Sequence, residues 1–456
     1  MGWVQLHPSH TPRPNAGGLR SLQPGIPPHT RLDNPPGLRY SLPHSFQPRS
    51  PALQIRAITA FISGSFPVDN AAVQGAAEFL QTARTALEQA GYIIQSLRLA
   101  TTPFPTYLSE PAQAPELAAS LAAAIRAAGL DYAAIGPVRL DDDPAYAAAL
   151  AEPLAAGRVF ASLEIADCRG RLSLAACRRC AQLVQTVAQR SGDGFGNLYL
   201  AALANCAPET PFFPASYARG GPLRFALAVE AADLAIQACD GATSPRDAAR
   251  RLRVAIERAG QDLGCIAEGI AGAHGAGFVG LDFSLAPYPE RERSLGTALE
   301  LLGGMPGDEG GIAAAALVAD AINRAQFPRC GFSGLMLPVL EDAALAARAA
   351  AGALTVHDLL LMSAVCGTGL DTIPLPGDTS LEALTGVLAD MGALALRSGK
   401  PLTARLMPMP GKQAGDPVTF DFAYFANSRV LALQGGLSHG PLSGDETIEI
   451  VRYSRS

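Results

Sequence analysis

The chain has 456 residues, of which 48% are hydrophobic and 17% charged, and its formal net charge at pH 7 is -6. This length suits one large α/β domain or two smaller domains, and the hydrophobic content predicts a globular core. The acidic balance without a basic stripe argues against nucleic acid as a partner. Charged residues interrupt the apolar runs before they reach the roughly 18 residues of a membrane-spanning helix, which argues against a membrane partner.

The first segment, residues 1–52, is rich in proline and has no periodic apolar pattern. Such a composition predicts disorder, and its prolines oppose the amphipathic helix of a transit peptide. We therefore expect a disordered segment over 1–52 and a single folded α/β domain over 53–456. The alternative is that translation starts further along the chain and that 1–52 is not part of the native product.

The first half of the folded part alternates between two patterns. β-branched and apolar runs are each followed by a helical period, and we predict helices over 70–90, 116–128, 145–155 and 172–190. Strands and helices that alternate with short connections are typical of a parallel sheet. The last of these helices contains Cys177 and Cys180. Because no second CxxC motif or histidine pair accompanies them, we expect no metal or redox role for the pair.

The stretch 191–221 breaks this rhythm. It is rich in glycine, proline and aromatic residues, which predicts long loops around short apolar pieces. Long loops inside a compact domain are usually functional, so we expect this stretch to form a lid or a wall of a site. Asn205, which lies in it, is a candidate substrate-binding residue. Four strand-like runs follow, over 277–287, 331–342, 369–378 and 401–411.

Five acidic residues lie in or directly after these later runs: Asp282, Glu341, Asp342, Asp371 and Asp378. The carboxyl ends of parallel strands line the site in α/β proteins, so several of these carboxylates could converge. Clustered carboxylates suit acid–base catalysis or a divalent cation such as magnesium, manganese or calcium. Asp282, Glu341, Asp371 and Asp378 are candidate catalytic residues, and Asp371 and Asp378 are also the candidate metal ligands.

The alternative is that such acids only stabilise helix ends. Asp342 and Asp378 precede helical stretches and could cap them. Thr379 with Glu382, and Thr355 with Asp358, match the spacing of a capping box.

Three further residues are candidates for chemistry. Cys366 precedes two glycines at the expected end of a helix, a position that does not favour a thiolate, and it has no adjacent histidine. A buried structural cysteine is the alternative to a catalytic one. Arg405 and Lys412 follow one another along the last strand-like run and could hold an anionic substrate, although surface cations would show the same pattern.

Six segments, in order, resemble a known family: IRAITAFIS, GNLYLAALANCAPETPFFPASY, GLDFSLAPYP, GFSGLMLPVLED, VCGTGLDTIPLPGDT and RLMPMPGK. The family is domain of unknown function 711, also labelled "PFL family protein" for pyruvate formate-lyase-like, and the resemblance runs from about Ile55 to Lys412. It implies an α/β barrel of about ten strands, similar to that of glycyl radical enzymes, with Cys366 as the first thiol to test.

The resemblance does not extend to glycyl radical chemistry. Glycyl radical enzymes carry their radical glycine near the C-terminus in an RVxG motif followed by an aromatic residue. The nearest run here, RVLALQGG from Arg429, lacks this pattern. Pyruvate formate-lyase activity is therefore not expected.

These observations predict an enzyme that acts on a small anionic metabolite. The eight cysteines of the chain are irregularly spaced and do not match a disulfide framework, which predicts a cytoplasmic location. The carboxylates and Cys366 would supply the chemistry or hold a divalent cation, and Arg405, Lys412 and Asn205 would contact the substrate. The alternative is a non-catalytic sensor of an amino-acid-like ligand on the same fold, since members of the family are often encoded beside a small amino-acid-binding regulatory protein. The sequence leaves the oligomeric state open, and a homo-oligomer is one of the alternatives.

Overall fold

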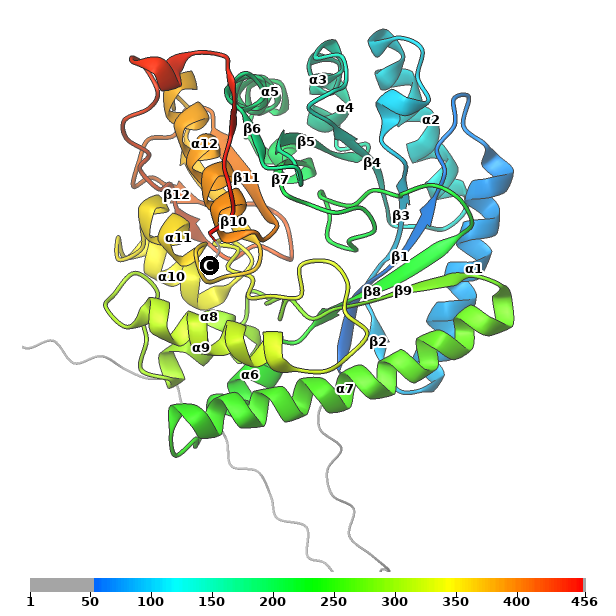
Figure 1. Ribbon diagram of the computed structural model, residues 1–456, viewed down its shortest axis with the longest axis vertical. Coiled ribbons are helices and arrows are strands. Elements are labelled where there is room, and N and C mark those ends of the chain that lie inside the picture. The colour runs from blue at the N-terminus through cyan, green and yellow to red at the C-terminus, as the bar shows by residue number, and fades with distance from the viewer. Residues whose placement is uncertain (1–52, 454–456) are drawn as a thin grey trace, which may run out of the picture. The chain divides into compact units, whose positions relative to one another are not determined.

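The structure, a computed structural model, describes residues 53–453. The predicted disorder of residues 1–52 falls outside the described residues, and the domain boundary after residue 52 stays a prediction. The described chain is mixed α/β, as expected, and is built on one twelve-stranded sheet (Figure 1).

Five neighbouring strands form the parallel centre of this sheet: β7 (Leu200–Ala204), β5 (Phe160–Ala166), β4 (Tyr132–Val138), β3 (Leu97–Thr101) and β1 (Gln54–Ile62). On each side of this centre lies a pair of strands. The two strands of a pair are parallel to each other and run antiparallel to the centre. The pairs are β11 (Leu402–Met409) with β10 (Gly369–Pro376), next to β7, and β8 (Arg224–Glu230) with β9 (Gly277–Asp282), next to β1. The short strands β2 (Ile93–Ile94), β6 (Arg171–Ser173) and β14 (Thr447–Glu449) complete the sheet. A separate hairpin pairs β12 (Pro417–Val418) with β13 (Ser428–Arg429).

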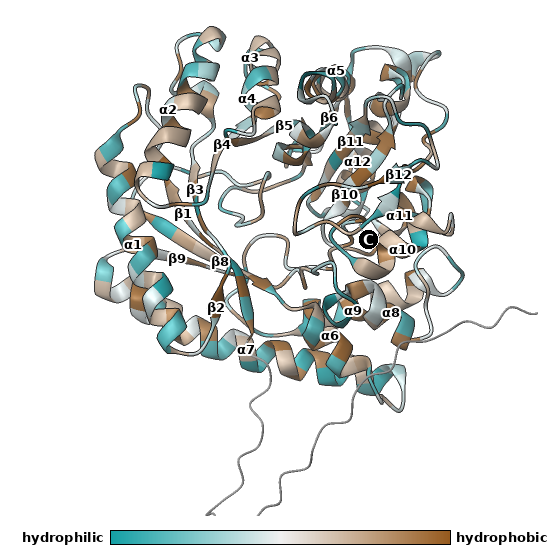
Figure 2. Ribbon diagram, turned by 180° about the vertical axis from the view of Figure 1, so that it is seen from behind, coloured by the Kyte–Doolittle hydropathy of each residue, from teal (hydrophilic) through white to brown (hydrophobic). Residues whose placement is uncertain are grey.

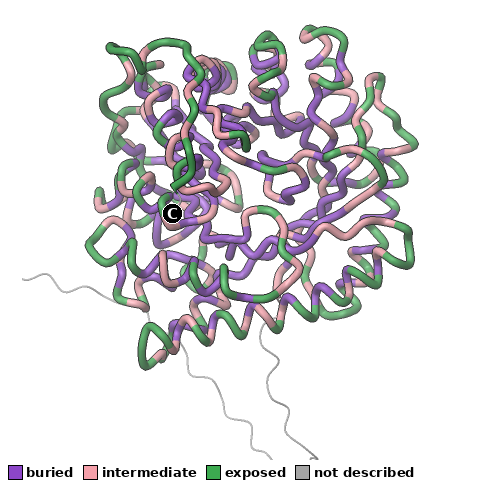
Figure 3. Tube along the Cα trace, in the orientation of Figure 1, coloured by how far each residue is buried: buried purple, intermediate pink, exposed green. Residues whose placement is uncertain are grey.

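The helices lie along the outer side of the curved sheet, with their hydrophobic residues turned towards it (Figures 1 and 2). Buried residues follow the strands, whereas exposed residues follow the outward faces of the helices (Figure 3). The helices are α1 (Asn70–Gln89), α2 (Ala114–Ala127), α3 (Ala145–Ala149), α4 (Ala151–Ala155), α5 (Leu174–Ser191), α6 (Ala232–Cys239), α7 (Pro245–His274), α8 (Leu295–Leu301), α9 (Gly311–Arg324), α10 (Ala343–Ala350), α11 (Val356–Met362) and α12 (Leu381–Ser398). None of these helices is long and apolar enough to span a bilayer.

The predicted helices of the first half are confirmed with one difference. The stretch 145–155 forms two short helices, α3 and α4, that meet at Leu150. Pro153 explains the break, because it has no backbone N–H to donate to the turn before it. Cys177 and Cys180 lie on α5 as expected, and burial raises the pKa of both thiols.

The capping predictions are partly confirmed. Asp342 caps α10 by accepting hydrogen bonds from the backbone N–H groups of Ala344 and Leu345, and Thr355 with Asp358 forms the predicted capping box of α11. The box predicted for Thr379 is wrong. Ser380 caps α12, while the Thr379 hydroxyl donates to the carbonyl of Pro376 in the preceding turn.

The sheet is not closed into a barrel. Within the described chain its two ends, β9 and β10, do not pair with each other. The segment 327–340 lies between them and makes one isolated bridge to each, Leu281 with Arg329 and Pro338 with Asp371. Pro328 and Pro338 cannot donate to a ladder, which explains why this segment forms no regular strand. The expected closed barrel of about ten strands, like that of glycyl radical enzymes, is therefore not found.

Candidate functional site

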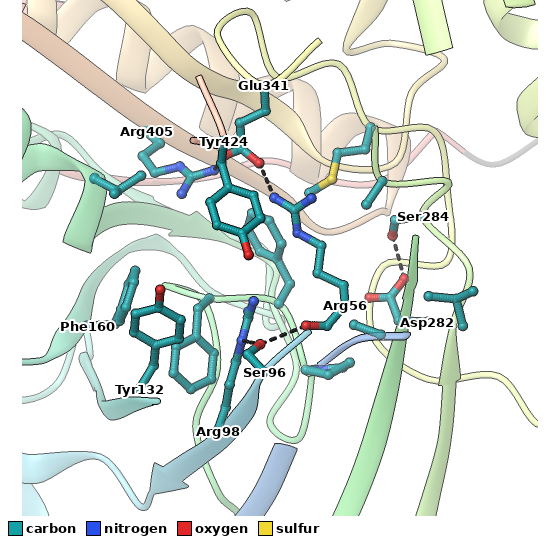
Figure 4. Close-up of a pocket in the computed structure, with 18 of the residues that line it drawn as sticks. Arg56, Ser96, Arg98, Tyr132, Phe160, Asp282, Ser284, Glu341, Arg405 and Tyr424 are labelled. Atoms are coloured by element: carbon teal, nitrogen blue, oxygen red, sulfur yellow. Dashed lines mark hydrogen bonds and ion pairs between the residues drawn. The ribbon is translucent and has the colours of Figure 1, made fainter. Parts of the chain in front are cut away.

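A pocket with a volume of about 100 Å³ opens on the inner side of the sheet (Figure 4). Aromatic side chains form much of its wall, and several of them come from the stretch 191–221, which supplies Tyr199, Phe212 and Phe213. This stretch is thus a wall of the pocket, as expected, although part of it forms strand β7. The loop between β12 and β13 adds Phe422 and Tyr424.

Arg56 reaches the pocket because strand β1 carries one extra residue. The pairing of β1 with β8 shifts between Ile55 and Ala57, so Arg56 has no partner residue on β8. Such a bulge changes the direction of a side chain. The two terminal nitrogens of Arg56 contact two carboxylates, Glu230 at 3.3 Å and Glu341 at 2.5 Å.

A second bulge places Asp371. Between Leu370 and Ile373 two residues of β10 face the single residue Arg405 of β11, and Thr372, the second of them, has a φ of 47°. The Nε of Arg405 donates to Asp371 at 2.6 Å, and its Nη2 donates to Glu341 at 2.8 Å. Asp371, Arg405 and Glu341 are all buried.

These residues belong to a chain of alternating charges. Arg293 and Arg56 bind Glu230, Arg56 and Arg405 bind Glu341, and Arg405 binds Asp371. Burial alone would lower the pKa of Arg405, but its two carboxylate partners raise it above the ordinary value. This charge network has three arginines and three carboxylates, so its formal charges cancel. At its outer end Arg293 also contacts the exposed Glu290 at 3.4 Å.

Arg98 lies outside this balance. It is half-buried on β3, where its Nε donates to the hydroxyl of Ser96 at 2.9 Å. Its guanidinium carbon lies 5.3 Å from the ring centre of Phe213 and 5.7 Å from that of Tyr132. Figure 4 shows this guanidinium pointing into the pocket. Among the described residues no carboxylate lies within 4 Å of it. Burial, and then neighbouring Arg56, lower the pKa of Arg98 to about 10, so it is charged at neutral pH.

Asp282 is the pocket's carboxylate without a cation. It ends β9, and no lysine or arginine within residues 53–453 forms an ion pair with it. Its oxygens accept hydrogen bonds from the hydroxyl of Ser284 and from the backbone N–H groups of Phe332 (3.0 Å) and Ser333 (2.9 Å). Burial raises the pKa of Asp282 despite these hydrogen bonds. Both Asp282 and Ser284 line the pocket.

The predicted metal pair does not come together. Asp371 is buried at the start of β10, whereas Asp378 is exposed beyond its far end, where it accepts a hydrogen bond of 3.4 Å from Gln413. The strand from Asp371 to Pro376 alone spans about 16 Å, and a turn follows it before Asp378. Within the described chain no group of three or more histidine, cysteine, aspartate or glutamate side chains is placed to hold a metal ion.

Three other candidates lie away from the pocket. Cys366 is buried near the end of α11, with its sulfur 3.4 Å from the N–H of Gly369. The Nζ of Lys412 donates to the carbonyl of Pro417 in its own loop. Asn205 has a φ of 56° and ends β7 in a turn. None of these three residues lines the pocket.

Of the candidates, Asp282, Glu341 and Arg405 line the pocket, and Asp371 contacts it through Arg405. The prediction did not include Arg56, Arg98, Ser96 or Ser284. A signal for two of them existed, because Ser96, directly before β3, and Arg98, within it, alternate with apolar residues along a strand that is otherwise buried.

Comparison with known proteins places the chain in a family. The family DUF711, described as "Uncharacterised ACR", matches residues 49–427, which is more than half of the chain. Relatives named UPF0210 protein include one from Methanopyrus kandleri, 35% identical over 57% of this chain and 59% of its own length. Another, from Syntrophobacter fumaroxidans, is 33% identical over 61% of this chain and 65% of its own.

A third relative, from Neisseria meningitidis serogroup B, is 30% identical over 58% of this chain and 60% of its own length. The chain thus matches about three fifths of the length of these relatives. Their names state no activity, and they give no support to the pyruvate formate-lyase-like relationship. Because the family match spans most of the folded chain, the protein belongs to the uncharacterised family DUF711.

Proposed function

We propose that the protein binds a small anionic metabolite in the pocket beside Arg98. The observation that carries this proposal is the Arg98 guanidinium, which is charged, half-buried and without a carboxylate within 4 Å among the described residues. A desolvated charge is costly unless a partner compensates it. An anionic ligand would supply that partner.

The eight cysteines are all free, which supports a cytoplasmic location.

The test is a screen of small ions by thermal unfolding of the full chain. Acetate and phosphate are compared with neutral acetamide at constant ionic strength, for wild type, Arg98→Met and Arg253→Met. Arg253 is exposed on α7 and serves as the matched control. We expect at least one anion to raise the Tm of wild type and Arg253→Met and to leave Arg98→Met unchanged. Equal shifts in all three proteins, or no shift in any, would contradict the proposal.

We further propose that the protein is an enzyme in which Asp282 exchanges a proton with the bound metabolite. Asp282 faces the pocket without a cation, and burial raises the pKa of its carboxyl, as suits a general acid or base near neutral pH. The second candidate function is a ligand sensor. It is favoured by Arg405, which neutralises Glu341 and Asp371 and leaves the pocket with few reactive groups.

Replacing Asp282 separates these two functions. We expect Asp282→Asn to keep the affinity for a bound anion within about threefold, because Arg98 is unchanged, and to abolish turnover, because the amide cannot exchange a proton. Turnover is followed by NMR of the ligand during incubation. If wild type binds the ligand and returns it unchanged, the sensor is supported and the enzyme is not.

A further inference from the structure

We infer that the anion bound by Arg98 is a short monocarboxylate with an apolar tail; this inference rests on the proposed function. Its first support is charge. The network of ion pairs that begins at Arg293 and ends at Asp371 is neutral. Arg98 is therefore the arginine of the pocket whose positive charge is left for a ligand. Glu341 and Asp282 line the same pocket. Because Glu341 is already paired with Arg56 and Arg405, a dianion such as phosphate would meet one free cation and the carboxyl of Asp282, whereas a monoanion balances Arg98.

The second support is the shape of the donor. Ser96 occupies the Nε of Arg98, which leaves the two terminal nitrogens to point into the pocket (Figure 4). Tyr132 and Phe213 lie near the guanidinium and restrict its movement. Two parallel N–H donors match the two oxygens of a carboxylate. Within the described residues the pocket is lined by no lysine, the side chain that binds phosphate as a point charge.

The third support is the remaining wall, which is apolar. Phe160, Leu198, Met336 and Ala286 line it. The volume of about 100 Å³ is smaller than the cavity of about 150 Å³ that holds benzene in another protein. A ligand that fits without rearrangement therefore has about four to six non-hydrogen atoms in all, its two oxygens included, as in a carboxylate of about two to four carbons.

The test is isothermal titration calorimetry of the full chain at pH 7.5 with a matched series. The probes are acetate, butyrate, octanoate, the neutral isostere butyramide and the dianion ethyl phosphate. We expect butyrate to bind about fifteenfold more tightly than acetate, because it buries two further CH₂ groups worth about fourfold each. Octanoate should gain nothing over butyrate, since the pocket is full. Butyramide and ethyl phosphate should each bind at least about tenfold more weakly than butyrate.

Arg98→Met, measured with the same probes, separates the outcomes. If ethyl phosphate binds more tightly than butyrate and Arg98→Met abolishes this binding, the anion site stands and the monocarboxylate is overturned. If butyrate and butyramide bind equally, or if acetate, butyrate and octanoate bind equally, the inference is also overturned. If no anion binds, the proposed function and this inference both fail. Loss of butyrate binding in Arg98→Met, with the expected order in wild type, supports both.

Discussion

Arg405→Met is expected to lower the free energy of unfolding by about 3–5 kcal/mol, the range for removing one partner of a buried ion pair. Asp371 is fully buried, and Arg405 holds its Oδ1 at 2.6 Å. Its Oδ2 has no hydrogen-bond partner in the described structure. Methionine would therefore leave a buried carboxylate with no compensating cation. Glu341 would keep only Arg56.

The measurement is urea unfolding, with the slope compared between variants to confirm that the same surface unfolds. Arg405→Met combined with Asp371→Leu is the informative second variant, because it removes both charges. We expect it to recover most of the lost stability, since replacing a buried ion pair with apolar side chains is often nearly neutral. Asp378→Asn, on the exposed candidate, should leave stability unchanged within about 0.5 kcal/mol. A loss below about 1 kcal/mol in Arg405→Met would show that this ion pair is not important for stability.

Arg98→Met is expected to have the opposite pattern, with a large effect on binding and a small one on stability. Hydrogen bonds to charged groups contribute about 1.5–3 kcal/mol, so the affinity for the anionic ligand should fall about 10- to 100-fold. Stability should change by less than about 1 kcal/mol. Methionine keeps the apolar stem against Tyr132 and Phe213. Losing the contacts between the guanidinium and these rings destabilises the fold, whereas removing an unpaired buried charge stabilises it, so the two effects offset each other.

Arg98→Lys refines this result. Lysine keeps the charge but lacks the two parallel donors of a guanidinium. Its affinity for a carboxylate should fall between those of wild type and Arg98→Met, as measured by calorimetry. A loss of stability in Arg98→Met as large as that in Arg405→Met would mean that Arg98 has a structural role, and an unchanged affinity would mean that the ligand lies elsewhere.

Much of the fold could be predicted from local patterns. The helical periods of α1, α2 and α5 are clear in the sequence. The position of the acids in or beside strand-like runs predicted that several carboxylates would converge, and Asp282 and Glu341 do line the same pocket. The missing barrel closure has a local cause that is visible in the sequence, because Pro338 lies in the run 331–342 that is expected to be a strand, and Pro328 lies just before it.

The pairing of charges could not be predicted in the same way. Arg56 and Glu341 are 285 residues apart in the chain, and the bulge that directs Arg56 into the pocket depends on the register of β1 against β8. The decisive property of Arg98 is the lack of a carboxylate neighbour among the described residues, which no short stretch of sequence encodes. Asp371 and Asp378 look equivalent in sequence, yet the greater part of β10 lies between them.

The interrupted sheet leaves one part of the pocket wall held by fewer ladder hydrogen bonds than the rest. Between β9 and β10 the chain 327–340 is joined to each strand by a single bridge, so few backbone amides there are protected by a ladder. Regions with few such bonds open locally at lower free energy than the body of a sheet. This segment also contains Met336, which lines the pocket, and Phe332, which holds Asp282. We therefore expect the amide hydrogens of 327–340 to exchange with solvent before those of β1, β3 and β4, and this part of the pocket wall to move first.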